Sequence, residues 1–101
     1  MNPLQDQHCP LCAIPAQFRF ADYDNQKHFY CSHCTEFRVT IRAEKILAES
    51  IPDWRTQFSE KARSAKGDAV WVITLPLGPK QHDVANPALV GSYVPRKDLA
   101  R

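Results

Sequence analysis

Four cysteines constrain this 101-residue chain more than any other feature, because they fall into two pairs of the same spacing. Cys9-Pro-Leu-Cys12 and Cys31-Ser-His-Cys34 are both C-x-x-C pairs, and 18 residues separate them. Two residues between cysteines allow the chain to turn so that both sulfurs reach one ion at about 2.3 Å. Two such turns at this separation are typical of a four-cysteine zinc site. We therefore predict one structural zinc ion, bound by Cys9, Cys12, Cys31 and Cys34.

Three other uses of the cysteines stay open at this point. A redox C-x-x-C usually opens a helix after a strand, whereas only eight residues precede Cys9 and a hairpin pattern follows it. Two disulfides would need an oxidising compartment, and the first residues resemble no secretory signal. A histidine could replace one cysteine, because His8, His28 and His33 lie beside the pairs. Four thiolates already complete a tetrahedron, however, so zinc bound by the cysteines is the favoured interpretation.

The expected zinc ion is structural because four sulfurs leave no open position for an activated water. The chain also lacks the H-x-E motif of the zinc deaminases, a glycine-rich phosphate loop and an evident cysteine–histidine nucleophile. A stretch of about 35 residues buries too little apolar surface to fold alone, and a metal ion compensates for that. We expect no enzymatic activity and no small-molecule substrate.

Composition and charge exclude other classes of protein. The apolar fraction of 44% is that of a soluble domain, and no apolar run approaches the roughly 18 residues that a membrane helix needs. The formal net charge is +2, but four thiolates and one Zn²⁺ would bring it close to zero. A neutral protein lacks the strong positive field of a sequence-independent nucleic-acid binder. We expect a cytoplasmic protein without a membrane segment.

Hydrophobic periodicity predicts a mixed α+β fold. Aromatic stretches on both sides of Asp24-Asn25-Gln26 predict a hairpin between the cysteine pairs. Glu36–Arg42 alternates polar and apolar residues, as a half-buried third strand would. Amphipathic spacing then predicts two helices packed on one face of the strands, and Ala69–Leu75 has the β-branched and aromatic residues of one further strand.

The last 26 residues contain four prolines and two glycines, which predict a flexible C-terminal tail. The chain is therefore expected to be one domain followed by this tail. The expected boundaries are 1–75 for the domain, 8–42 for three antiparallel strands, about 43–66 for the helices, about 69–75 for the last strand and 76–101 for the tail.

The two cysteine pairs, with an aromatic hairpin between them, resemble the zinc-ribbon (rubredoxin-like) superfamily and especially its short, uncharacterised bacterial members. The resemblance covers residues 8–42 and implies a metal-binding ribbon without specifying a partner. Ribbon knuckles often carry glycine directly after the second cysteine of each pair. This chain has Ala13 and Thr35 at those places, which makes the local turn geometry a point to test.

Two polar surfaces are relevant to nucleic-acid binding. Strand alternation places one set of residues on the face turned away from the helices, where a basic, partly aromatic surface could contact phosphates and bases. This set is Arg19, Tyr23, Arg38 and Arg42. The second set lies along the second helix and is interpreted as a solvated face. It consists of Arg55, Ser59, Arg63 and Lys66.

The predicted tail is more apolar than a linker needs, with Val84, Val90, Tyr93 and Val94 within it. Extended segments of this kind add to a sheet edge or fill an apolar groove on a partner. We therefore predict a small non-catalytic zinc-binding protein that acts as a protein-interaction module, through a protein partner or self-association. A nucleic-acid-binding regulator of the zinc-ribbon type is the alternative function.

Overall fold

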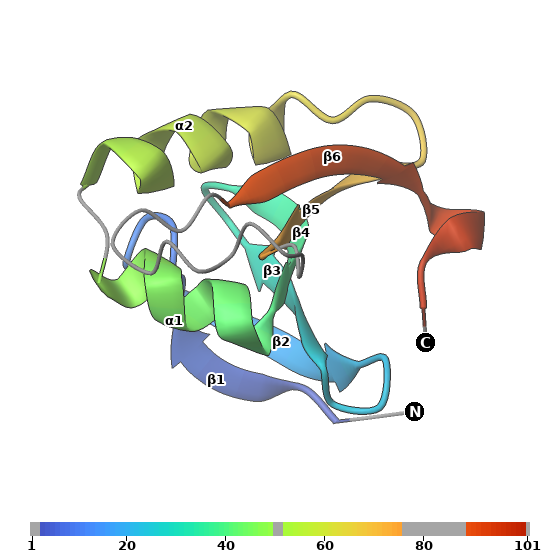
Figure 1. Cartoon of the computed structure of the whole chain (residues 1–101), viewed down its shortest axis with the longest axis horizontal. Helices are drawn as coiled ribbons and strands as arrows, with labels where there is room; N and C mark the ends of the chain where they lie inside the picture. Colours follow the sequence, from blue (N-terminus) through green and yellow to red (C-terminus); the bar gives the residue numbers. More distant parts are fainter. Residues whose placement is uncertain (1–2, 50–51, 76–88, 101) are drawn as a thin grey trace, which may run out of the picture.

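The computed structural model describes residues 3–49, 52–75 and 89–100, and these residues form a twisted six-stranded sheet with two helices (Figure 1). The strands follow one another across the sheet in chain order. The elements are β1 (Gln5–His8), β2 (Pro15–Ala21), β3 (Gln26–Cys31), β4 (Thr35–Thr40), α1 (Ile41–Glu49), α2 (Pro52–Arg63), β5 (Ala69–Thr74), β6 (Val90–Pro95) and a short 3-10 turn η1 (Arg96–Asp98).

Strands β1 to β4 form an antiparallel meander, and the predicted hairpin between the cysteine pairs is the β2–β3 pair. Its register places Phe18 opposite Phe29, and Phe29 is opposite Phe37 on β4. The Phe29 and Phe37 rings are stacked with centroids 5.2 Å apart. Because this row of three aromatic rings is buried, it fixes the register and forms the centre of the core.

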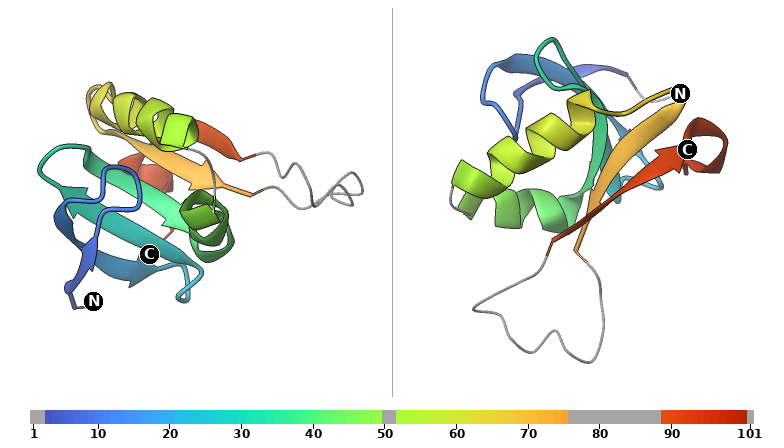
Figure 2. Two further views of the ribbon diagram at one scale, coloured as in Figure 1. Left: turned by 90° about the vertical axis from the view of Figure 1, so that its left-hand side faces the viewer. Right: turned by 90° about the horizontal axis from the view of Figure 1, so that it is seen from above.

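In the chain, the two helices come between β4 and β5, which pair with each other in parallel. Parallel neighbours need a long crossover, and the two helices supply it. Figure 2 shows both helices on the same side of the sheet. Ala43 and Leu47 of α1 and Phe58 and Ala62 of α2 are buried in the core. The sequence therefore predicted correctly that two helices cover one face.

One boundary differs from the sequence prediction. The third strand was expected to continue to Arg42, but it ends at Thr40 and α1 begins at Ile41. The Thr40 hydroxyl accepts a hydrogen bond from the Ala43 backbone N–H at 3.2 Å, as an N-cap residue does. The cap satisfies a free N–H of the first helical turn, so the chain leaves the strand earlier than alternation alone indicates.

The prediction of a flexible tail is wrong for residues 89–100. Strand β6 pairs with β5 along its whole length, from Ala69 opposite Pro95 to Thr74 opposite Val90. Gly91 lies within this strand, and the Trp71 ring explains why glycine is needed there. A Cβ atom at this position would lie 2.0 Å from Cζ2 of Trp71. The sequence predicted four strands, and β6 together with β1 brings the sheet to six. Residues 76–88 of the predicted tail, Val84 among them, lie outside the described residues.

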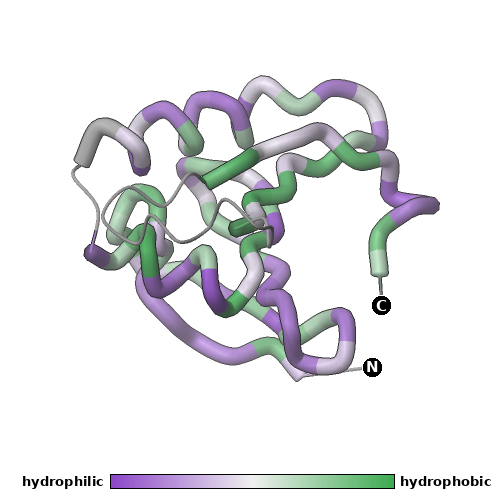
Figure 3. Tube along the Cα trace, in the orientation of Figure 1, coloured by the Kyte–Doolittle hydropathy of each residue, from purple (hydrophilic) through white to green (hydrophobic). Residues whose placement is uncertain are grey.

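Strand β1 was not predicted, because its sequence Gln-Asp-Gln-His has no apolar alternation. In Figure 3 this strand is coloured hydrophilic, whereas β5 is largely hydrophobic. Polar contacts hold β1 in place instead. Lys27 of β3 donates to the Gln7 side chain at 2.8 Å and pairs with Glu44 of α1 at 2.9 Å. Within the described ranges, neither helix has the length and apolar character to cross a membrane.

Candidate metal centre

The two cysteine pairs occupy two neighbouring turns of the meander. Cys9 and Cys12 lie between β1 and β2, and Cys31 and Cys34 lie at the β3–β4 connection. Because β2 and β3 are antiparallel partners, the start of β2 is beside the end of β3, and both turns are at the same end of the sheet. The four sulfur atoms all lie within 4.8 Å of one another, so they could hold one metal ion.

The distances between the sulfurs suit a tetrahedral ion. Sγ of Cys9 is 3.8 Å from Sγ of Cys34, and Sγ of Cys12 is 3.4 Å from Sγ of Cys31. Four sulfurs at about 2.3 Å from a central ion would be about 3.8 Å apart. A disulfide would bring two sulfurs to about 2.05 Å, and all four cysteines are free. The arrangement therefore fits a metal centre and not the disulfide alternative.

Each turn points backbone N–H groups at a sulfur. The Leu11 N–H donates to Sγ of Cys9 at 3.4 Å, and the Cys34 N–H donates to Sγ of Cys31 at 3.3 Å. The residues that follow the pairs, Ala13 and Thr35, have left-handed φ values of 67° and 71°. These are the places where ribbon knuckles often carry glycine. Both residues adopt the left-handed conformation without being glycine, at a cost of roughly 1–2 kcal/mol per residue.

The cysteine thiols are shielded from water, and this changes their acidity. Cys9, Cys31 and Cys34 are buried and Cys12 is half-buried. A hydrogen bond with Cys34 is the main cause of the raised pKa of the Cys9 thiol, and burial is the second. Burial raises the pKa of Cys12 to about 11. These two thiols hold their protons at neutral pH, and a metal ion must displace those protons in order to bind.

A serine from α2 touches the cluster. Ser59 is buried, with 4% of its surface exposed, and its Oγ lies 3.0 Å from Sγ of Cys34. Ser59 was predicted to lie on a solvated stripe with Arg55 and Arg63, and for Ser59 this prediction was wrong. Ser59 lies at the edge of the apolar stripe that contains Phe58, so helix phase alone would have permitted either environment. Direct contact with a cysteine 25 residues earlier has no signature in the sequence.

The histidines are not part of this cluster. Within residues 3–49, 52–75 and 89–100, the group that could hold a metal contains the four cysteines alone. His28 is buried elsewhere, on the sheet, where its Nε2 is 2.5 Å from Oε2 of Glu36 and its Nδ1 accepts a hydrogen bond from Nε of Arg38 at 2.7 Å. His28, which lies beside the second cysteine pair in the sequence, therefore belongs to a second polar cluster and not to the metal centre.

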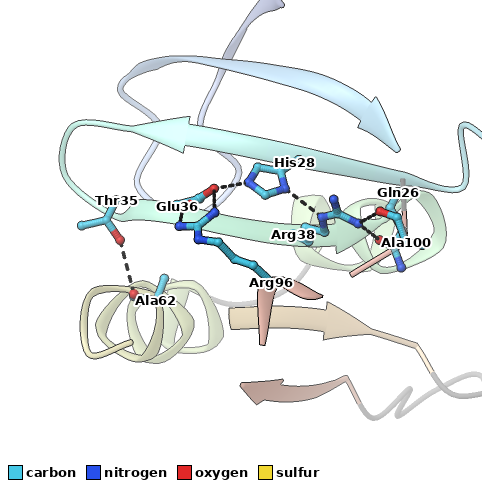
Figure 4. A network of polar contacts seen from close by, with 8 residues as sticks. All are labelled: Gln26, His28, Thr35, Glu36, Arg38, Ala62, Arg96 and Ala100. Carbon is cyan, nitrogen blue, oxygen red and sulfur yellow. Dashed lines mark hydrogen bonds and ion pairs between the residues drawn. The ribbon is translucent and has the colours of Figure 1, made fainter. Parts of the chain in front are cut away.

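This second cluster lies on the sheet and is closed by the end of the described chain (Figure 4). Arg96 of η1 binds both carboxylate oxygens of Glu36, and Arg38 donates to the Ala100 carbonyl oxygen. We call this cluster the clasp. It comprises His28, Glu36 and Arg38 from the sheet and Arg96 and Ala100 from the segment after β6.

Hydrogen bonds and burial shift the pKa values of two residues of the clasp, Glu36 and His28. The hydrogen bonds from Arg96 lower the pKa of Glu36 to about 2, although burial acts in the opposite direction. Burial lowers the pKa of His28, so the imidazole stays neutral and can accept the hydrogen bond from Arg38. In the clasp, the Arg96 guanidinium therefore binds the ionised Glu36 carboxylate directly, and the neutral His28 ring links this carboxylate to the Arg38 guanidinium.

The clasp also changes the basic surface that the sequence predicted. Arg38 is buried, with 6% of its surface exposed, and so cannot reach a nucleic acid in this structure. Arg42 belongs to α1 instead of the third strand. Arg19 lies over the Tyr30 ring at 5.6 Å, and Tyr23 is at the exposed tip of the β2–β3 turn. Arg19 and Arg38 both lie opposite His28 and so share the predicted face, but Arg38 is buried and Arg42 is on α1, so the predicted surface of four residues is not assembled.

Comparisons with known proteins provide no relative for this chain. No protein-family model matches it, and no curated protein or solved structure matches it.

Proposed function

We propose that this chain is a small, non-catalytic zinc protein of the zinc-ribbon type that serves as a protein-interaction module. The observation that carries the zinc assignment is the group of four cysteine sulfurs within 4.8 Å of one another. Four thiolates in a tetrahedron suit zinc, and they also suit iron. Metal analysis of the protein purified from cells distinguishes the two, and we expect about one zinc per chain.

The proposed role of the zinc ion is structural. Four thiolates close its coordination sphere, so no position is left for a water molecule or substrate. The ion would join the β1–β2 turn to the β3–β4 turn and so hold this end of the meander together. Chelation is therefore expected to lower the melting temperature strongly. A protein that melts at the same temperature with and without chelator would contradict this role.

Two observations favour protein binding over nucleic-acid binding: the free edge of the sheet at β6 and the burial of Arg38. Within the described chain, β6 has a strand partner on one side only, and its sequence carries no charged residue. Val90 and Tyr93 on this strand are exposed. Uncharged strand edges accept an additional strand from another protein. Meanwhile, the basic surface expected for nucleic acid is not assembled, because Arg38 is buried.

The test uses the full chain as bait in native lysate, with and without nuclease. A Val90→Lys variant places a charge on β6, and a Leu4→Lys variant, which also replaces an exposed apolar residue, serves as the matched control. We expect a protein partner to be captured by the wild type and by Leu4→Lys but not by Val90→Lys. Loss of capture on nuclease treatment would promote nucleic-acid binding instead.

A further inference from the structure

The contact between Ser59 and the metal centre has a consequence that rests on the proposed zinc site. A zinc ion with four thiolates carries a net charge of −2, and three of the four cysteines are buried here. Such a charge requires hydrogen-bond donors around the sulfurs. Backbone N–H groups supply donors to Cys9 and to Cys31. Cys34, with 0% of its surface exposed, is the ligand most shielded from water.

The direction of the hydrogen bond to Cys34 follows from chemistry. Oγ of Ser59 and Sγ of Cys34 are 3.0 Å apart, and either atom could donate if the cysteine were a thiol. A metal-bound thiolate has no proton, so only the serine hydroxyl can donate. This is a charge-assisted hydrogen bond in a site that excludes water, which is the kind with the largest effect.

A second contact joins the same turn to the same helix. Thr35, which directly follows Cys34, donates its hydroxyl to the Ala62 carbonyl oxygen at 3.3 Å. Ser59 and Ala62 are three residues apart and so lie on neighbouring positions of α2. One turn of the meander is therefore attached to one turn of the helix by two hydrogen bonds, one of which ends on a metal ligand.

We propose that Ser59 is a positioning residue of the metal centre: its hydroxyl donates to the Cys34 thiolate, stabilises the metal-bound form and makes the docking of α2 depend on the metal. When the ion leaves, the charge that this hydrogen bond stabilises is lost with it. The helix then keeps its apolar contacts, the Thr35 hydrogen bond and the hydrogen bond that the Tyr93 hydroxyl donates to the Lys61 carbonyl oxygen.

The first test uses cobalt(II), because zinc has a filled d shell and no visible spectrum. Full-length protein is loaded with cobalt, and the thiolate-to-metal charge-transfer bands are recorded for wild type and Ser59→Ala. Loss of a donor raises the energy of the sulfur lone pair, so we expect these bands to move to longer wavelength. Release of zinc to a chelator is expected to accelerate about tenfold. Ser59→Thr, which keeps the hydroxyl, is expected to restore the bands.

Ser64→Ala is the matched control, because the Ser64 hydroxyl donates to the Glu60 carbonyl oxygen at 2.8 Å, away from the cluster. We expect this variant to keep the wild-type spectrum and release rate. If Ser59→Ala also keeps both, the proposed role of Ser59 is wrong. A general loss of packing would change stability without moving the charge-transfer bands, so the spectrum separates the two explanations.

Hydrogen exchange of the wild-type chain tests the coupling even if Ser59→Ala folds poorly. Amides of α2 are expected to exchange faster once zinc is removed, whereas amides of β5 and β6 are expected to change less. Equal protection of α2 with and without zinc would overturn the coupling. Zinc content is measured first: a chain that binds no metal refutes the proposed function, whereas a zinc-loaded chain with an unchanged Ser59→Ala spectrum refutes this inference alone.

Discussion

The metal centre and the clasp both act on strands β3 and β4, but they hold them in different ways. The metal centre uses four copies of one residue type, grouped in two short turns. The clasp uses five different residues, and its contacts span 8 to 62 positions along the chain. The four thiolates share one ion, so removal of one ligand weakens the whole centre, whereas the clasp is a set of separate hydrogen bonds. We therefore expect an all-or-none response from the first and a graded response from the second.

The largest effect is expected from Cys34→Ser. Structural zinc contributes on the order of 10 kcal/mol to the folding of small zinc domains, and the serine variant should lose its metal and a large part of its stability together. Metal analysis and circular dichroism measure both. His33→Ala is the control, because this exposed residue lies in the same turn and does not belong to the cluster. A Cys34→Ser chain that stays folded and fully loaded with zinc would rule out the four-cysteine site.

Gly91→Ala should have the next largest effect. The added Cβ would lie 2.0 Å from Cζ2 of Trp71, so the ring or the strand must move. Overpacking of this kind costs about 1–3 kcal/mol. Urea unfolding measures the loss, with Ser92→Ala at the adjacent exposed position as control. We expect the zinc content to stay at the wild-type level. An unchanged free energy of unfolding would mean that β6 does not pack on Trp71 as described.

Arg38→Met tests the clasp itself. The change leaves Nδ1 of His28 and the Ala100 carbonyl oxygen without the donors they have now. Loss of such a buried partner costs about 1–3 kcal/mol. Arg42→Met, at an exposed position of α1, is the control. We expect Arg38→Met to melt earlier while it keeps its zinc, since the clasp residues contribute no metal ligand. Equal melting temperatures for the two variants would show that the clasp adds nothing to stability.

Mild acid should produce the smallest effect. Burial lowers the pKa of His28, so its contribution to stability is present above the ordinary histidine pKa of about 6.5 and is lost as the pH falls below it. Protonation would place a cation beside Arg38 and remove the acceptor for its Nε–H, while Glu36 stays ionised down to about pH 2. An NMR titration of the imidazole in zinc-saturated protein, assigned with His28→Gln, measures this. A pKa of His28 above 6.5 would contradict it.

Sequence reasoning succeeded where the signal is local. The cysteine spacing predicted that the four sulfurs would meet, and alternation around Phe37 predicted a strand. Both depend on residues a few positions apart, for which backbone geometry fixes the relation between side chains. The same reasoning placed two helices between β4 and β5.

It failed where a distant segment changes the environment. Alternation correctly turned Arg38 away from the helices, but it could not show that a segment about 60 residues later covers that face. Ser59 was misplaced for the same reason, because its partner is in another turn of the chain. In the sequence, Gly91 predicts a break in a strand. The position of the Trp71 ring explains why this strand requires glycine there.

The parallel pairing of β4 with β5 has a consequence for the order of folding. Strands β2, β3 and β4 each pair with their immediate predecessor through a short connection, so residues up to Thr40 can pair while the rest of the chain is still being synthesised. The β4–β5 pair requires closure of a loop that contains both helices, residues 41–68, and such non-local pairing is slow. We therefore expect the cysteine turns to capture metal first. Strands β5 and β6 would then join a nucleus that the ion has already fixed.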